Sequence, residues 1–135
     1  MVLIDPNTGA LTQAKEFKEN SRVTIREVTK PATISDALRI HDYRYIKRVI
    51  SKCEQLYKKL EQATDEVEIS SRFDNDSHIS AQTWAAALHA AGAVIDACDK
   101  IMTPEYRNAF CAVRPPGHHA GVFGKTFKNN VCDQE

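Results

Sequence analysis

Hydrophobic residues recur at helical spacing in two long stretches of this chain. In the first, from Tyr45 to Leu60, apolar residues follow one another at intervals of three or four, which is the spacing of one helix face. Asp42 stands before this stretch as a candidate N-cap. The other face carries five cations: Lys47, Arg48, Lys52, Lys58 and Lys59. Such a face could contact acidic partners, but a solvated surface is the simpler interpretation.

The second stretch predicts a helix over about 81–102. Ser80 is its predicted N-cap, and Thr103-Pro104 predicts its end, because proline disfavours helical geometry in the residue before it. Gly92 is less favourable than alanine inside a helix by about 1 kcal/mol, so we expect another backbone to approach there. Steps of three and four residues form one apolar seam: Trp84, Leu88, Ala91, Ile95, Cys98 and Met102. Of these we expect Trp84, Leu88, Ile95 and Cys98 to be buried.

Shorter signals predict the remaining elements. The segment 33–36 reads Thr-x-x-Asp, the spacing of a capping box, ahead of a short helix over 35–40. The apolar run 108–114 is bounded by turn-forming residues and predicts a buried strand, and Val2–Ile4 could form another. The polar, acidic run 64–76 predicts a loop.

Composition and charge narrow the class of protein. The chain has 135 residues, with 18 Lys and Arg against 18 Asp and Glu, and 42% of its residues are hydrophobic. This length suits one globular domain, and zero net charge argues against nonspecific binding to nucleic acid. No apolar run reaches the roughly 18 residues of a membrane span, and the first residues lack the basic start and apolar stretch of a secretory signal.

Four cysteines are spread along the chain without a Cys-x-x-Cys pair. This is neither the spacing of a zinc ribbon nor the density of a secreted disulfide scaffold. Cys53 and Cys98 fall on the predicted apolar helix faces, so we expect both to be buried and reduced. This usage indicates a reducing compartment, the cytosol or the nucleus.

Two adjacent histidines, His118 and His119, follow the predicted strand after a Pro-Pro-Gly sequence. The prolines stiffen this loop, and Gly117 permits a positive φ or a close backbone approach. Imidazole side chains suit proton transfer near neutral pH, and two of them can divide the work, one accepting a proton while the other stays charged. From spacing alone, an exposed histidine pair or a surface site for a transition metal is equally open.

The run over 110–120 reads Phe-Cys-Ala-Val-Arg-Pro-Pro-Gly-His-His-Ala. It resembles the histidine motif of the zinc-dependent histone deacetylase family, in the form typical of the class II branch and of acetylpolyamine amidohydrolases. Three further stretches are similar in the family's order: 32–46, with Ala-Thr and His-Asp-x-x-Tyr-Ile, the loop 74–80, and the alanine-rich segment 84–95. The resemblance covers about residues 25–121 and leaves 122–135 as a loop or insertion. We therefore expect 1–135 to be a partial deacetylase domain.

The resemblance implies an α/β fold, the N-terminal part of a three-layer fold of the arginase/deacetylase type. For this part we expect mostly helix with one or two strands. The implied reaction is hydrolysis of N-acetyl-lysine in histones or other proteins, with Zn²⁺ as cofactor of the full-length enzyme. The family's zinc ligands, an Asp-x-His and a further Asp, follow the histidine pair and are not found before Glu135. No metal ligand is therefore assigned, and we expect this chain to be inactive alone.

Individual residues match functional positions of the family. His119 matches the main general acid and base, and His118 matches the histidine that supports it electrostatically. Asp76 matches the rim aspartate that accepts hydrogen bonds from the substrate backbone, and an acid ahead of a helix N-terminus is a second role open to it. Gly117 is assigned with Asp76 to substrate binding, because it sets the loop beneath the active site.

The resemblance also implies acetylated histones or other acetyl-lysine proteins as partners, together with proteins of the corepressor type. It implies no direct contact with nucleic acid or membrane, and a role in chromatin and transcription regulation in the nucleus or cytoplasm. One departure is that the family's Gly-Phe-Cys segment is missing after the histidines, so Phe127 is not assigned to the acetyl-lysine tunnel. The alternatives are a non-catalytic deacetylase-like module that binds acetylated peptides, and an acetylpolyamine deacetylase.

Overall fold

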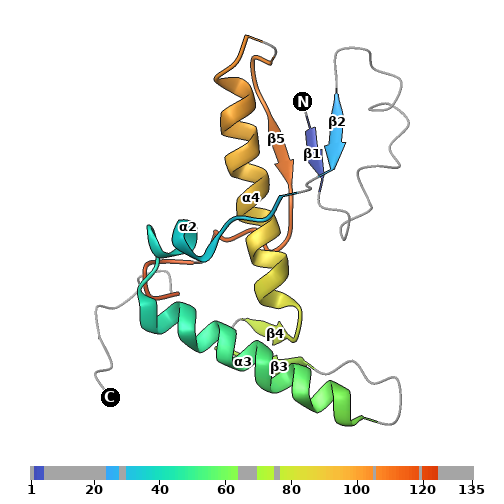
Figure 1. Cartoon of the computed structure of the whole chain (residues 1–135), viewed down its shortest axis with the longest axis vertical. Coiled ribbons are helices and arrows are strands. Elements are labelled where there is room, and N and C mark those ends of the chain that lie inside the picture. Colours follow the sequence, from blue (N-terminus) through green and yellow to red (C-terminus); the bar gives the residue numbers. More distant parts are fainter. Residues whose placement is uncertain are drawn as a thin grey trace.

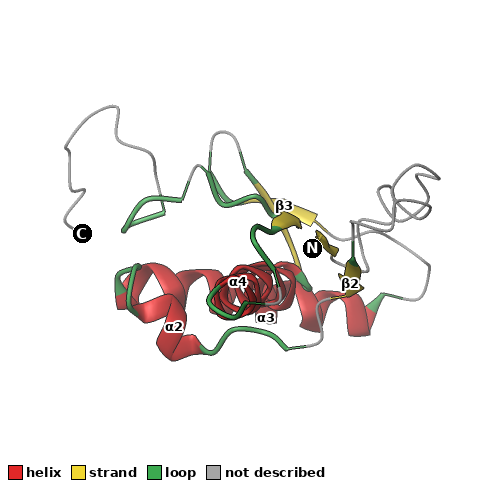
Figure 2. Cartoon of the chain, turned by 90° about the horizontal axis from the view of Figure 1, so that it is seen from above, coloured by secondary structure: helices red, strands yellow, loops and turns green. Residues whose placement is uncertain are grey.

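Two long helices, α3 (Tyr43–Gln62) and α4 (Thr83–Ile101), lie across one another and organise the chain (Figure 1). The computed structural model describes residues 2–4, 24–27, 30–63, 70–74, 77–104, 106–118 and 120–124. Seen from above, the strand β3 lies on one side of the two long helices (Figure 2). The shorter elements are β1 (Val2–Ile4), β2 (Ile25–Glu27), α2 (Ile34–Leu38), β3 (Ser70–Arg72), β4 (His78–Ser80) and β5 (Phe110–Ala112).

Three of the strands form a parallel sheet in the order β2-β1-β5. Leu3 in the central strand pairs with Arg26 on one side and with Cys111 on the other. The strands predicted at 108–114 and at Val2–Ile4 are present as β5 and β1. The prediction that the first of them is buried is wrong, because β5 covers only Phe110–Ala112 and Phe110 is 62% exposed. Parallel neighbours cannot be joined by a tight turn, so this sheet brings together segments that are far apart in the chain. The described residues contain more strand than the one or two strands expected.

Strands β3 and β4 form a separate antiparallel pair, with Ser71 opposite Ile79. The prediction of a loop over 64–76 is therefore wrong at 70–72. The sequence Ser-Ser-Arg has no apolar alternation that would indicate a strand, and only its pairing with β4 makes it one. Ser80 ends β4 instead of capping the next helix. Its backbone N–H donates to Thr83 Oγ1 at 2.8 Å, and α4 begins there with no side-chain cap.

The predicted caps of the first two helices are confirmed. Thr33 and Asp36 form a capping box, in which the Thr33 N–H donates to Asp36 Oδ2 at 2.8 Å and the Asp36 N–H donates to Thr33 Oγ1 at 3.3 Å. The hydrogen bonds from the Thr33 side chain and backbone hold the pKa of Asp36 below its ordinary value. Asp42 Oδ1 accepts the Arg44 N–H at 2.8 Å and starts α3. Helix α2 ends at Leu38, slightly before the predicted boundary.

The described core is divided between the two ends of α4. Near its first turns, the buried face of α3 packs with β4 and half-buried Trp84; this cluster consists of Val49, Cys53, Leu56 and Ile79. In its second half, Ala93 and Ala97 pack against Cys111 of β5 and the residues beside it. Helix α4 is thus the element that joins the parallel sheet to α3 and the hairpin.

The predicted buried seam of α4 is only partly correct. Trp84 and Leu88 are half-buried, but Ile95 is 41% exposed, Met102 is 85% exposed and Cys98 is also exposed. The side that is buried in the second half of α4 carries alanines, which let the sheet approach closely. Ile95 and Met102 continue the helical period of apolar residues, but α3 and the hairpin cover only the first turns of α4. Cys53 is buried as expected, whereas Cys98 is not.

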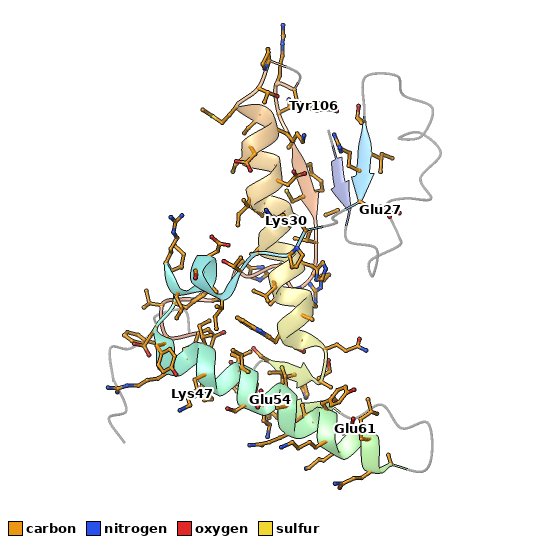
Figure 3. The ribbon with its side chains drawn as sticks, in the orientation of Figure 1. Glu27, Lys30, Lys47, Glu54, Glu61 and Tyr106 are labelled. Carbon is orange, nitrogen blue, oxygen red and sulfur yellow. The ribbon has the colours of Figure 1, made fainter. Side chains whose placement is uncertain are left out.

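Gly92 lies where another backbone crosses α4, as its position in the sequence predicted. The segment 30–32 passes there, with Lys30 beside the middle of α4 (Figure 3). A Cβ at Gly92 would lie 2.7 Å from Ala32 N and 2.9 Å from Pro31 C, and would also overlap the Lys30 carbonyl oxygen. One turn away, the Leu88 carbonyl accepts the Ala32 N–H at 2.8 Å. A side chain at this position would separate the two backbones and break that hydrogen bond.

We expect Gly92→Ala to lower the free energy of unfolding by about 1–3 kcal/mol, because the added methyl group meets backbone that cannot move aside. Helix propensity alone would change stability in the opposite direction by about 1 kcal/mol. Urea unfolding followed by circular dichroism measures the difference. Ala91→Gly, at the exposed neighbouring position, is the control and should be less stable by only about 1 kcal/mol. A Gly92→Ala variant more stable than the parent would contradict the close crossing.

Candidate active site

The histidine loop, which we define as residues 113–124, leaves the carboxyl end of β5. Gly117 has φ +75°, and its carbonyl accepts the Ala120 N–H at 2.9 Å, which closes a tight turn. The positive φ expected of Gly117 is confirmed, and a side chain there would be strained even though the surrounding space is open. His118 is exposed within this turn, and the Arg114-Pro115 peptide bond is cis. His119 lies outside the described residues.

The start of α3 holds the far end of the histidine loop. The Asp42 N–H donates to the Val122 carbonyl at 2.9 Å, and His41 Nδ1 lies 2.9 Å from the Gly121 carbonyl oxygen. Gly124, at φ +79°, rests so close to the Tyr45 ring that a Cβ would overlap it. The loop is thus fixed at β5 by the chain itself and at α3 by these tertiary contacts.

Aromatic contacts continue from this loop toward the hairpin. The rings of His41 and Tyr45 have centroids 5.3 Å apart, and those of Tyr45 and Phe73 are 6.4 Å apart in an edge arrangement. Burial raises the pKa of the Tyr45 hydroxyl, which Arg48 opposes and Asp74 reinforces. The hydroxyl therefore stays protonated well above neutral pH, and the ring acts as a packing surface between loop and hairpin.

The turn that joins β3 to β4 is held by its own hydrogen bonds. The Phe73 N–H donates to the Ser77 carbonyl at 2.9 Å, and the Ser77 N–H donates to Asp74 Oδ1 at 2.7 Å. Asp76, the predicted rim aspartate, lies outside the described residues. Both roles named for Asp76, at the rim and ahead of a helix N-terminus, stay predictions.

No three His, Cys, Asp or Glu side chains converge among the described residues. These residues do not form a zinc site, and we assign no metal ligand to them. In the same part of the chain, no helix has both the length and the apolar character needed to cross a membrane.

Comparison with known proteins decides the family. A family model described as "Histone deacetylase domain" matches residues 7–131. The chain belongs to the histone deacetylase family. This match confirms the resemblance read from the histidine motif and its companion segments.

Relatives within the histone deacetylase family are much longer than this chain. "Type-2 histone deacetylase 2" of Dictyostelium discoideum is 30% identical over 131 residues, which cover 87% of this chain and 8% of that protein. "Probable deacetylase" of Archaeoglobus fulgidus is 29% identical over 117 residues, covering 84% of this chain and 28% of that protein. The crystal structure of the HDA15 HD domain superposes with a TM-score of 0.61 at 27% identity, over 78% of this chain and 26% of that one. The deacetylase fold is thereby shown for this part of the domain.

His41 and Tyr45 are the residues that sequence analysis did not assign to the site. Both belong to the His-Asp-x-x-Tyr-Ile segment, whose resemblance to the histone deacetylase pattern was the available signal. Their function as anchors of the histidine loop becomes visible only where α3 meets residues 121–124, about 80 positions away. His41 is therefore a positioning residue for the loop that carries His118.

We expect His41→Ala to loosen the histidine loop without unfolding the chain. A net hydrogen bond of about 0.5–1.5 kcal/mol is lost, so amide hydrogen exchange at Ala120 and Gly124 should accelerate about three- to tenfold. The control is His89→Ala, since His89 Nδ1 also lies 3.0 Å from a backbone carbonyl, that of Ala85 within α4. Equal acceleration in both variants, or none with His41→Ala, would contradict the anchoring function.

Proposed function

We propose that this chain contributes the N-terminal part of the catalytic domain of a zinc-dependent deacetylase that hydrolyses N-acetyl-lysine in histones or other proteins. The observation that carries this proposal is the placement of the His-His loop. It leaves a strand of a parallel sheet at the carboxyl end, the edge where α/β folds bind their ligands, and it is docked on α3 by His41 and Asp42. The residues 1–135 act in this proposal as one partial domain.

Within this proposal the two histidines divide proton transfer between them. His119 accepts a proton from the attacking water and later donates it to the departing lysine amine. His118 supports its neighbour electrostatically, from the exposed turn closed by Gly117. Asp76 holds the substrate backbone at the rim, and Gly117 gives the loop the backbone conformation that this arrangement needs.

Zinc supplies a Lewis acid and an activated water when it is bound. Because the family's Asp-x-His and later Asp are not found between the histidine pair and Glu135, we propose that its ligands come from sequence outside this chain, and that the chain is inactive alone. Acetylated histones or other acetyl-lysine proteins are the proposed substrates, with corepressor-type proteins as partners in the nucleus or cytoplasm. A role in chromatin and transcription regulation follows from these assignments.

The test is His119→Ala in the full-length protein, assayed on an acetyl-lysine peptide. Loss of a general acid and base should lower kcat by about two to four orders of magnitude. Bound zinc should remain stoichiometric, because the proposal gives His119 no metal contact. His89→Ala is the matched control and should leave kcat unchanged, since that side chain contacts its own helix.

Two results would overturn this assignment. A His119→Ala enzyme that keeps its activity would remove the proton-transfer role, and one that loses its zinc would make the histidine a ligand. Turnover and one tightly bound zinc per molecule in the 135-residue chain by itself would contradict the proposal that ligands lie elsewhere.

A further inference from the structure

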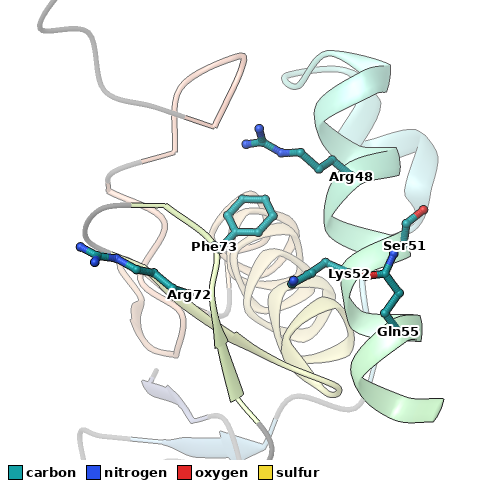
Figure 4. A pocket seen from close by; sticks show the side chains of 6 residues that line it. All are labelled: Arg48, Ser51, Lys52, Gln55, Arg72 and Phe73. Carbon is teal, nitrogen blue, oxygen red and sulfur yellow. The ribbon is translucent and has the colours of Figure 1, made fainter. Parts of the chain in front are cut away.

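A small hollow lies between α3 and the hairpin formed by β3 and β4. Its volume is about 290 Å³. Four of its lining residues stand on one face of α3, and two come from the hairpin: Arg48, Ser51, Lys52, Gln55, Arg72 and Phe73 (Figure 4). None of these is a residue of the proposed catalytic reaction, so the hollow is a separate feature of the chain.

The lining of this hollow concentrates positive charge in a chain whose net charge is zero. Among the lining residues that the structure describes, three are cationic and none is acidic. Arg48 and Lys52 stand four positions apart on α3, and like charges at this spacing destabilise a helix. The acidic residues Glu54 and Glu61 of the same helix do not line the hollow (Figure 3). Helix stability therefore does not account for the arrangement.

Arg48 is held in place before any ligand arrives. Its guanidinium lies 4.7 Å from the centre of the Phe73 ring. The ring is itself fixed by its edge contact with Tyr45 and by the cluster around Val49 and Ile79. Stacking uses the face of a guanidinium and leaves its N–H groups at the edge to donate. A positioned arginine loses less conformational entropy when it binds an oxyanion.

The other lining residues complete a set of donors. Lys52 reaches from α3 toward Phe73, and Ser51 and Gln55 add neutral polar groups beside it (Figure 4). Arg72 Nε already donates to the Asp74 carbonyl at 3.0 Å, so Arg72 is engaged within the hairpin and the site rests on Arg48 and Lys52. Asp74 does not line the hollow, and its carboxylate accepts the Ser77 N–H.

We propose that this hollow binds the phosphate group of a phosphoserine or phosphothreonine in a peptide segment. Such a group carries a charge of about −1.5 to −2 and three acceptor oxygens, which suits a fixed arginine beside a lysine. A volume of about 290 Å³ admits one side chain rather than a helix. Arg48 covers one face of the Phe73 ring and leaves less of it for a nucleic-acid base to stack on, so a peptide is favoured over single-stranded nucleic acid.

The experiment is a titration of the ¹⁵N-labelled chain, followed by NMR, with an unlabelled glycine-alanine peptide that carries one central phosphoserine. Amide shifts should concentrate at Ser51, Lys52 and Phe73. The same peptide with serine in place of phosphoserine should bind with an affinity at least about tenfold lower, as expected for loss of charge-assisted hydrogen bonds. Peptide with glutamate, inorganic phosphate and an oligo-dT strand are titrated in parallel at physiological salt.

Two double variants of α3, each of which removes two positive charges, distinguish binding in the hollow from nonspecific electrostatic attraction of the phosphopeptide to the helix. Arg48→Gln with Lys52→Gln should weaken phosphopeptide binding about tenfold or more. Lys47→Gln with Lys58→Gln removes two cations that do not line the hollow, and should change binding less than about twofold. Lys52→Gln alone tests the site without disturbing the Arg48–Phe73 stack, and circular dichroism checks that each variant is folded.

Several results would overturn the proposal. Equal losses in the two double variants would mean general electrostatic attraction. Equal affinity for serine and phosphoserine peptides would exclude phosphate recognition, and equal affinity for inorganic phosphate would exclude a peptide contribution. Tighter binding of oligo-dT, or of the glutamate peptide, would assign the hollow to a different ligand. None of these measurements depends on turnover, so they are independent of the proposed deacetylase activity.

Discussion

The arrangement of this chain depends on one backbone-to-backbone crossing, where residues 30–32 pass over the middle of α4 at Gly92. The Ala32 N–H donates to the Leu88 carbonyl there, and Gly92 leaves the space that the crossing needs. Before the crossing the chain forms β2 of the parallel sheet, and after it the chain forms α2 and α3. The crossing therefore sets where α3 lies relative to α4, and with it the position of every residue that α3 holds.

The histidine loop depends on this placement of α3. One end of the loop is continuous with β5, which packs on the alanine face of α4. The other end is bound by His41 and Asp42 at the start of α3. The loop thus spans two elements whose relative position is fixed by α4, and a reactive side chain on it gains precision from a rigid scaffold.

The first turns of α3 and the residues before it combine two separate tasks at different positions along the helix. Residues at its start bind the histidine loop, while Arg48 and Lys52 face the hairpin and form the cationic hollow. Tyr45 and Phe73 lie between the two regions and contact each other. A peptide segment bound in the hollow would therefore contact Phe73, whose ring contacts Tyr45, the residue against which Gly124 of the loop packs.

The sequence by itself determined the features that depend on local chemistry. Residues near one another in the chain were enough to predict the capping box at Thr33, the cap at Asp42 and the buried face of α3. The same holds for the presence of strand β5 and for the family motif. Gly92 inside a helix was enough to indicate a close crossing, although not which segment crosses there. Tertiary structure decided the rest. Strand β3 exists only through its pairing with β4, and Ile95 and Cys98 are exposed despite their helical period, because burial requires a neighbouring element to cover them. The anchoring function of His41 and the hollow beside Phe73 likewise join residues from separate segments, and no local pattern specifies which distant segments will meet.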